Sequence, residues 1–204
     1  ASWLGTIIMW ATEQQPFFMG ILVSVIVGIV LTLPISSAAV CAALSLTGLA
    51  GGAAVAGCCA QMVGFAVCTY RENKMNGLVS IGLGTSMLLV PNLMSKPILW
   101  LPPTLAAAVT GPIATCIFNL QMNGSPISSG MGTSGLVGPI GVVTGWFTPS
   151  EAALNAGASA IAPGAMDWIG LVLICFVLPA ALALLFSEIM RKQGWIKEGD
   201  YKLV

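Results

Sequence analysis

Long apolar runs separated by short polar breaks dominate this chain, and the length of each run indicates the element it forms. Four runs have the length of a membrane-crossing helix, which needs about 17–25 mostly apolar residues. They cover residues 17–33, 51–69, 104–120 and 168–186. The pattern therefore predicts an all-α integral membrane protein built as a polytopic helical bundle.

Two further apolar segments do not have the pattern of simple crossings. The apolar run in segment 78–91 is only 13 residues long, which is too short to cross at 1.5 Å per residue. Segment 124–147 is polar at its start and dense in glycine. Irregular backbone at membrane depth is tolerated only where protein or a water-filled cavity surrounds it. We therefore expect both segments to be re-entrant hairpins inside the bundle.

Composition supports the membrane class and argues against others. Only seven basic and seven acidic residues occur among 204, whereas a soluble domain carries about a quarter charged residues. No charge lies between Glu13 and Arg71, or between Lys96 and Glu151. A soluble protein with a buried core is the alternative, but there is too little polar surface to cover such a core. The chain has no basic patch of the kind that binds nucleic acid.

The placement of Lys and Arg predicts the orientation, because cytoplasmic loops carry an excess of these residues. Bases occur near Arg71, at Lys96 and in the C-terminal tail, so we expect all three regions to be cytoplasmic. Segment 78–91 would then enter and leave on the cytoplasmic side, and segment 124–147 on the outer side. The predicted domains are a transmembrane domain, 1–187, and a cytoplasmic tail, 188–204.

One connection, 148–167, carries acids but neither Lys nor Arg, and we expect it to lie outside. Its two acids, Glu151 and Asp167, are expected to be loop or helix-start charges rather than proton relays. No acid or base lies within a predicted span, which argues against a proton-coupled pump. A neutral, hydroxyl-rich solute fits this pattern, as does an anion held at helix termini.

The residue types in this sequence do not indicate a catalytic site or a metal site. Histidine is absent, which excludes phosphohistidine chemistry and histidine-based catalysis in this chain. The six cysteines lie in apolar segments without metal-type spacing, and buried cysteine behaves as a small hydrophobe. We predict no cofactor, no metal and no catalytic residue.

A motif of the form GxGTSxLxxP occurs twice, as "GLGTSMLLVP" at 82–91 and "GMGTSGLVGP" at 130–139. Thr and Ser are natural helix N-caps, and the N-termini of broken helices bind anions or hydroxyl oxygens. Paired interrupted segments in two halves of a transporter point to a midplane binding site. We therefore expect the two motif copies to hold the solute.

A second repeat, "PISS", occurs at 34–37 and again at 126–129, directly before the second motif copy. The alternative for all these residues is close helix packing, which small residues allow in membranes. We prefer that alternative for "GGAAVAG" at 51–57, and Gln61 is interpreted equally as a packing contact or a wall of the site. The candidate solute-binding residues are Gly84, Thr85, Ser86, Asn123, Ser128, Ser129, Gly132, Thr133 and Ser134.

Several long motifs resemble the second family of phosphotransferase-system membrane subunits, the enzyme IIC-like proteins that include toxin-regulator-like membrane proteins. They are "LTLPISSAAV", "GLAGGAAVAGCCAQMVGFAV", "YRENKMNGL", "GLGTSMLLVPNL", "LPPTLAAAVTGPIAT" and "GSPISSGMGTSGLVGPIG". The resemblance implies a multi-pass protein of the bacterial inner membrane with a IIC-like fold. It also implies a homodimer that moves a sugar while a soluble IIB-type partner phosphorylates it.

The sequence departs from that family in two ways. Sugar-specific IIC subunits carry a Glu, and often a His, at the sugar site, whereas this chain has no His and no acid in either hairpin. Relatives are longer, so we expect N-terminal spans to be missing here. The leading hypothesis is a IIC-type permease for a small polar solute. A solute sensor without transport and a structural subunit are the alternatives.

Overall fold

The computed structural model describes residues 2–203, which form helices and connecting segments without a β-strand. Three helices are long and apolar enough to cross a membrane: Gly48–Cys68, Pro97–Ile117 and Ala165–Lys192. The predicted all-helical membrane fold is thus confirmed. The predicted span 17–33 forms a shorter apolar helix, Pro16–Thr32. Membrane insertion of segments 78–91 and 124–147 as re-entrant hairpins stays a prediction.

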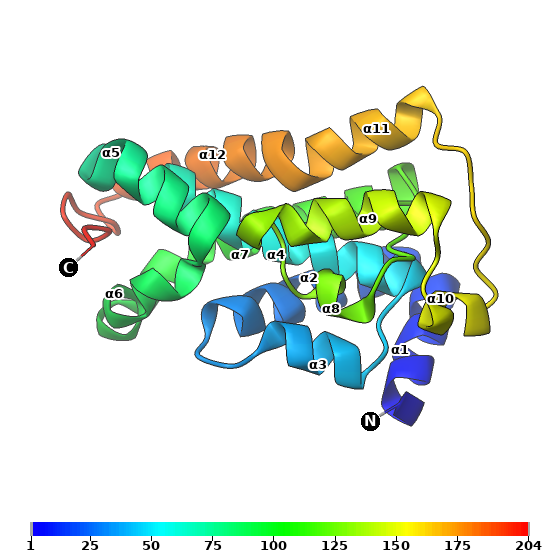
Figure 1. Ribbon diagram of the computed structural model, residues 1–204. Coiled ribbons are helices and arrows are strands. Elements are labelled where there is room, and N and C mark those ends of the chain that lie inside the picture. Colours follow the sequence, from blue (N-terminus) through cyan, green and yellow to red (C-terminus); the bar gives the residue numbers. More distant parts are fainter. Residues whose placement is uncertain (1, 204) are drawn as a thin grey trace.

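The helices follow one another with few long connections (Figure 1). The first half contains α1 (Ser2–Gln14), α2 (Pro16–Thr32), α3 (Ser37–Ala43), α4 (Gly48–Cys68), α5 (Tyr70–Val79), the π turn η1 (Ser80–Gly84), the 3-10 turn η2 (Ser86–Leu89) and α6 (Val90–Ser95). The second half contains η3 (Pro97–Trp100), α7 (Leu101–Pro112), η4 (Ile113–Ile117), α8 (Pro126–Ser129), η5 (Ser134–Leu136), α9 (Val137–Phe147), α10 (Glu151–Asn155), α11 (Ala165–Val172), η6 (Leu173–Val177) and α12 (Leu178–Lys192).

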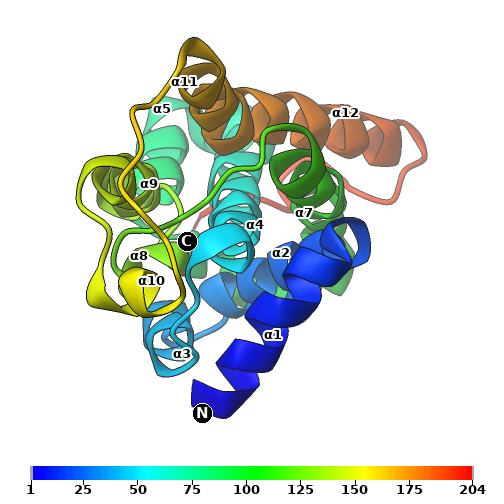
Figure 2. The ribbon, with the colours of Figure 1, turned by 90° about the vertical axis from the view of Figure 1, so that its right-hand side faces the viewer.

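Helix α4 is the centre of the bundle, and α2, α7 and α12 pack around it (Figure 2). Its glycines permit this close approach, as predicted for 51–57. A Cβ on Gly57 would lie 1.9 Å from the carbonyl oxygen of Ser24 on α2. The Ser24 hydroxyl in turn donates to the carbonyl of Ala107 on α7, 2.9 Å away. Small residues and a buried hydroxyl therefore bring three helices together, as is common in membranes.

Gln61 links two of these helices, because its Nε2 donates to Thr104 Oγ1 at 3.1 Å. Its Oε1 is buried without a partner within the described residues. Of the two interpretations of Gln61, the packing contact is the one that this hydrogen bond supports.

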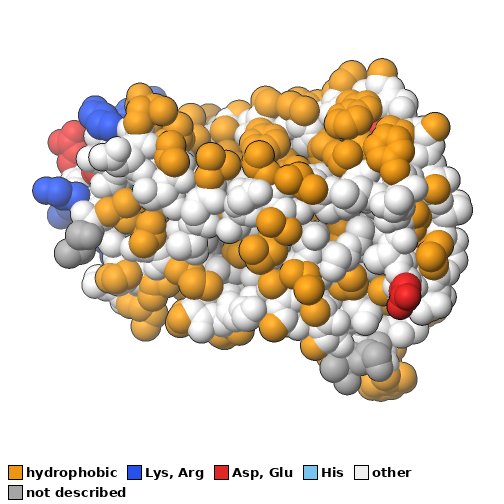
Figure 3. All heavy atoms as spheres, viewed as in Figure 1, with side chains coloured by type: hydrophobic (Ala, Val, Ile, Leu, Met, Phe, Trp, Pro, Cys, Tyr) orange, Lys and Arg blue, Asp and Glu red, His pale blue; other side chains and the backbone are white. Residues whose placement is uncertain are grey.

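The two ends of the bundle differ in charge (Figure 3). We call the end with α5, α6 and the C-terminus the basic end, because α5, Lys96, the end of α12 and the tail hold all seven Lys and Arg residues. Three ion pairs join these elements: Arg71–Glu188, Arg191–Glu72 and Lys96–Asp200. The opposite, acidic end has Glu13, Glu151 and Asp167.

At the acidic end, Glu151 and Asp167 lie in the first turns of α10 and α11. The Asp167 carboxylate accepts a hydrogen bond from the backbone N–H of Gly164 at 2.7 Å. A negative charge in a first turn interacts favourably with the helix dipole. Both acids are therefore helix-start charges, as expected from the sequence.

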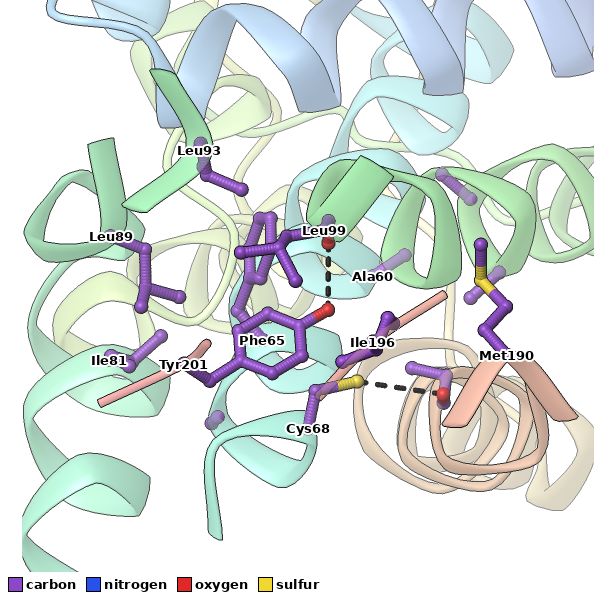
Figure 4. Close-up of a cluster of buried hydrophobic side chains, with 14 residues drawn as sticks. Ala60, Phe65, Cys68, Ile81, Leu89, Leu93, Leu99, Met190, Ile196 and Tyr201 are labelled. Atoms are coloured by element: carbon purple, nitrogen blue, oxygen red, sulfur yellow. Dashed lines mark hydrogen bonds between the residues drawn. The ribbon is translucent and has the colours of Figure 1, made fainter. Parts of the chain in front are cut away.

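The C-terminal segment packs against the bundle (Figure 4). The Tyr201 ring is fully buried beside Phe65, and its hydroxyl donates to the Leu99 carbonyl at 2.8 Å. Burial raises the pKa of this phenol, so Tyr201 stays neutral. The described part of 188–204 is thus fixed to the transmembrane helices, and its cytoplasmic location stays a prediction.

Candidate functional site

The first motif copy, 82–91, lies in a stretch of chain that starts and ends at the basic end. Asn73, before it, donates from Nδ2 to the Tyr201 carbonyl at 2.7 Å. Asn92, after it, donates to the carbonyls of Asp200 and Lys202 at 2.8 and 3.0 Å. Both flanks of this copy therefore bind the same few residues of the tail.

The second motif copy, 130–139, lies in a stretch that starts and ends at the opposite end of the bundle. The backbone N–H of Ser150 donates to the Asn123 carbonyl at 2.9 Å, and the Ser150 hydroxyl donates to the Gly124 carbonyl at 2.8 Å. Between these points the chain runs inward through α8 and returns through α9 (Figure 1). The two copies thus approach each other from opposite ends.

The two copies meet at their GTS residues. Thr133 Oγ1 donates to the Gly82 carbonyl at 2.5 Å, and Ser134 Oγ donates to the Gly84 carbonyl at 2.9 Å. The hydroxyls of the second copy therefore bind the last turn of η1 in the first copy. This contact joins residues about 50 positions apart, and residue spacing alone does not indicate it.

The backbone of the first copy is broken at the contact. Thr85 is extended, with φ −153° and ψ 139°, between the π turn η1 and the 3-10 turn η2. Its Oγ1 accepts a hydrogen bond from the Met87 N–H at 3.2 Å, so Thr85 caps η2 as predicted. Ser86 is buried, and its hydroxyl pairs with that of Thr32 at 3.0 Å. Ser86 thus fixes the copy to α2.

A cavity of about 210 Å³ lies beside this contact. Its polar lining comes from both repeats: Ser36, Ser37, Gly84, Thr85 and Ser134. Its apolar lining is Leu31, Ile35, Ala38, Met62, Met87 and Met131. We call this space the motif cavity. It offers hydroxyl groups and backbone but no charged side chain, so its chemistry is suited to binding a neutral polar group.

The two "PISS" repeats also lie together, because α3 packs against α8. The Ser37 hydroxyl donates to the Gly130 carbonyl at 2.7 Å. In the second repeat, the buried Ser129 hydroxyl donates to the Leu46 carbonyl at 2.8 Å, and Ser128 packs beneath Gly141. Ser128 and Ser129 thus hold α8 in place and do not line the motif cavity, whereas Ser36 and Ser37 of the first repeat do.

The two candidate glycines have different surroundings. Gly132 has φ +53°, a left-handed conformation, and an added Cβ would lie 2.7 Å from the Cys58 carbonyl carbon. A side chain there would disturb the packing on α4. At Gly84 an added Cβ would meet no atom within 4 Å, although the residue lines the motif cavity. Of the two, only Gly84 can be replaced by a larger residue that fills the cavity without disturbing the packing on α4.

Asn123 lies apart from the GTS candidates, although Ser129 and Met122, the residue before Asn123, both border Gly51. Met122 pairs with Gly48 at the start of α4, whereas Gly132 packs on Cys58. Ten residues of helix at 1.5 Å each separate these points by about 15 Å. Asn123 lines a second cavity at the acidic end.

Sequence reasoning missed Met62 and Met131, which line the motif cavity. Methionine is flexible and fills irregular space. Their positions within apolar runs carry no signal that separates them from other core residues. Ser36 and Ser37 belong to the first "PISS" repeat, but only the second repeat was predicted to contact the solute.

Comparison with known proteins assigns the family. A family model described as "Phosphotransferase system, EIIC" matches residues 1–203. No curated protein and no solved structure matches the chain. The match covers both motif copies and both "PISS" repeats, on which the resemblance rested. The chain therefore belongs to the phosphotransferase system EIIC family and is a membrane component of that system.

Proposed function

We propose that this chain is a permease subunit that passes a small polar solute of the sugar class between its two motif copies. The observation that carries the proposal is the contact of Thr133 and Ser134 with the backbone of Gly82 and Gly84. Two broken segments that arrive from opposite ends and meet beside a cavity supply a gate between two compartments. Separating the copies would open a path along the bundle.

The chemistry of the motif cavity supports a neutral solute. The Ser36 and Thr85 hydroxyls accept from backbone N–H groups and keep their protons to donate to a solute, while the Ser134 hydroxyl donates to Gly84 and can accept from one. The cavity has no charged lining residue. An ion would lose its hydration there without a partner of opposite charge. The motif cavity therefore favours an uncharged polar group over an ion.

Orientation and partners follow from the charge distribution and the family. We place the basic end in the cytoplasm, since Lys and Arg gather on that side of membranes. A soluble IIB-type partner would then meet α5, α6 and the tail, and the protein would act as a homodimer in the inner membrane. Phosphate transfer would depend on that partner, because the motif cavity has no acid or base in its lining.

Replacing Gly84 by Leu tests the proposal. The new side chain enters the motif cavity without meeting an atom within 4 Å at its Cβ. We expect uptake of radiolabelled hexoses and hexitols into proteoliposomes to fall by about tenfold or more, equivalent to 1.4 kcal/mol of lost binding. The matched control is Gly164→Leu, because Gly164 is exposed and lies far from the motif in the loop before α11. Unchanged uptake by a well-folded Gly84→Leu protein would remove the motif cavity from the path.

A solute sensor without transport is the second candidate, and one observation favours it. The tail binds both flanks of the first motif copy through Asn73 and Asn92. Movement of that copy would therefore shift the tail, where a cytoplasmic partner could detect it. A protein that binds solute in detergent but shows no uptake in proteoliposomes would support the sensor over the permease.

A further inference from the structure

A second cavity lies at the acidic end and is separate from the motif cavity. Its volume is about 430 Å³, which falls in the range of about 300–1,000 Å³ for small-molecule pockets. Its walls come from the end of α1, the start of α4, the irregular segment 118–123, and α10 with the residues after it. Figure 2 looks onto these elements. We call this space the acidic-end cavity.

An unpartnered polar atom belongs to its wall. Asn123 is 3% exposed, and its Oδ1 has no hydrogen-bond partner in the described part of the chain. Its Nδ2 is engaged with Gln121 Oε1 at 3.3 Å. A buried carbonyl oxygen without a donor is unfavourable. A solute in the cavity that donates a hydrogen bond to Asn123 Oδ1 would therefore remove this unfavourable state.

The N-terminus of the 21-residue helix α4 supplies donors to the same space. Its N-cap residue, Thr47, makes no side-chain cap and instead donates to Met9 Sδ at 3.6 Å. The Gly48 N–H donates to the Met122 carbonyl at 3.0 Å, while the N–H groups of the next two residues have no acceptor within the helix. These two residues, Leu49 and Ala50, line the cavity. The cavity thus presents acceptors on one wall and donors on another.

The charged groups around the acidic-end cavity limit the class of solute that it can bind. Glu13 lies at the exposed rim, and no Lys or Arg lines the cavity. The carboxylate opposes an anion, while the positive end of the α4 dipole opposes a cation. Hydroxyl groups satisfy both walls, because each one donates and accepts. We propose that the acidic-end cavity is a binding site for an uncharged polyhydroxylated solute.

The site also has a place in the proposed transport. Its nearest lining residue on α4, Ala50, lies about 18 Å along the helix from Met62 of the motif cavity, on the side that the charge pattern puts outside. This part of the inference rests on the proposed function: the acidic-end cavity would receive the solute that the motif copies then pass. Binding itself does not depend on transport, so the two are separable by experiment.

The test uses the full chain in detergent and measures thermal stabilisation by hexoses, hexitols, inorganic phosphate and putrescine. Ala156→Leu fills the cavity from an exposed position, and Ala160→Leu is its control, an exposed residue of the following loop that does not line the cavity. Asn123→Ala removes the unpartnered acceptor. We expect a hexose or hexitol to stabilise the wild-type protein. Its dissociation constant should rise at least tenfold in Ala156→Leu and Asn123→Ala, and stay unchanged in Ala160→Leu.

Gly84→Leu separates this inference from the proposed function. It should bind the solute at the acidic-end cavity as the wild type does, while its uptake fails. If Ala156→Leu binds as tightly as the wild type, the acidic-end site is wrong even where uptake is intact. Stabilisation by phosphate or putrescine alone, or by no probe, would also overturn it. Binding that is lost in Ala156→Leu, in a protein without uptake, would keep the site and reject the permease.

Discussion

The two ends of this bundle are built in different ways. The basic end is closed: three ion pairs and the amides of Asn73 and Asn92 join α5, α6, α12 and the tail. The acidic end has short helices, small residues such as Ala153 and Gly157, and an open cavity with an unpartnered Asn123 oxygen. One end is therefore fixed by its own contacts, while the other has a buried polar atom that the described residues leave without a hydrogen bond.

The charge balance follows the same division. The basic end has seven Lys and Arg against four Asp and Glu, and the acidic end has three acids. The formal charge is therefore about +3 at one end and −3 at the other, although the whole chain is neutral. The asymmetry fits the positive-inside rule. It also places the predicted docking surface for a soluble partner and the predicted solute entrance at opposite ends.

The largest expected effect on stability comes from breaking the buried pair at the basic end. Arg191 contacts Glu72 at 2.9 Å and the Cys68 carbonyl at 3.2 Å, and both charged side chains are less than a tenth exposed. Arg191→Ala leaves Glu72 buried without its partner, which costs about 3–5 kcal/mol. Reversible unfolding in mixed micelles measures this loss.

The control for that prediction is an ion pair between the same two helices. Arg71 and Glu188 are 57% and 38% exposed, and an exposed pair contributes about 0–1 kcal/mol. Arg71→Ala should therefore change stability little. Equal losses in Arg71→Ala and Arg191→Ala would show that burial does not distinguish the two pairs.

A smaller effect is expected at the acidic end. The Ser150 hydroxyl caps α10 by accepting from the Ala153 N–H at 3.3 Å, and it donates to the Gly124 carbonyl. Ser150→Ala should cost about 1 kcal/mol, the usual value of an N-cap. Ser125→Ala is the matched control, because Ser125 precedes α8 without a side-chain cap. A Ser150→Ala loss as large as that of Arg191→Ala would contradict a loosely held acidic end.

The smallest expected effect is the loss of Asp200's contribution to stability at low pH. Burial alone would raise the pKa of Asp200, but hydrogen bonds from Lys96 and the Lys197 N–H outweigh it and lower the pKa. A lowered pKa means that the contribution to stability is present above the unfolded value of about 3.9. It is lost as the pH falls through the folded pKa.

Thermal midpoints of wild type and Asp200→Asn measured from pH 7 to pH 3 test this sign. The wild type should be the more stable protein near neutral pH, and the difference should shrink below about pH 4. A difference that grows as the pH falls would refute the pairing with Lys96.

The helices that the sequence predicted best are those with long apolar runs, such as 51–69 and 168–186. Burial and membrane length both favour the same helix there. The meeting of the two motif copies was expected from their repetition, but the donor and acceptor of each hydrogen bond were not. They depend on the broken backbone at Thr85 and on the left-handed Gly132.

Two features lay beyond the sequence pattern. The sequence predicts only a cytoplasmic tail, and nothing in "IKEGDYKLV" indicates that Ile196 and Tyr201 are buried or that distant Asn side chains bind its backbone. Asn123 shares its polar stretch with the second motif copy. The pairing of Met122 with Gly48 fixes it at the acidic end instead. Both outcomes arise from contacts between residues far apart in the chain.

The measurement that tests the central claim most directly is uptake after chemical modification of Gly84→Cys. The background is Cys116→Ser, because Cys116 is the exposed cysteine among the described residues. A small methanethiosulfonate reagent should label Cys at position 84 and abolish sugar uptake in proteoliposomes, and excess solute should slow the labelling. Complete labelling with unchanged uptake would contradict a path between the two motif copies.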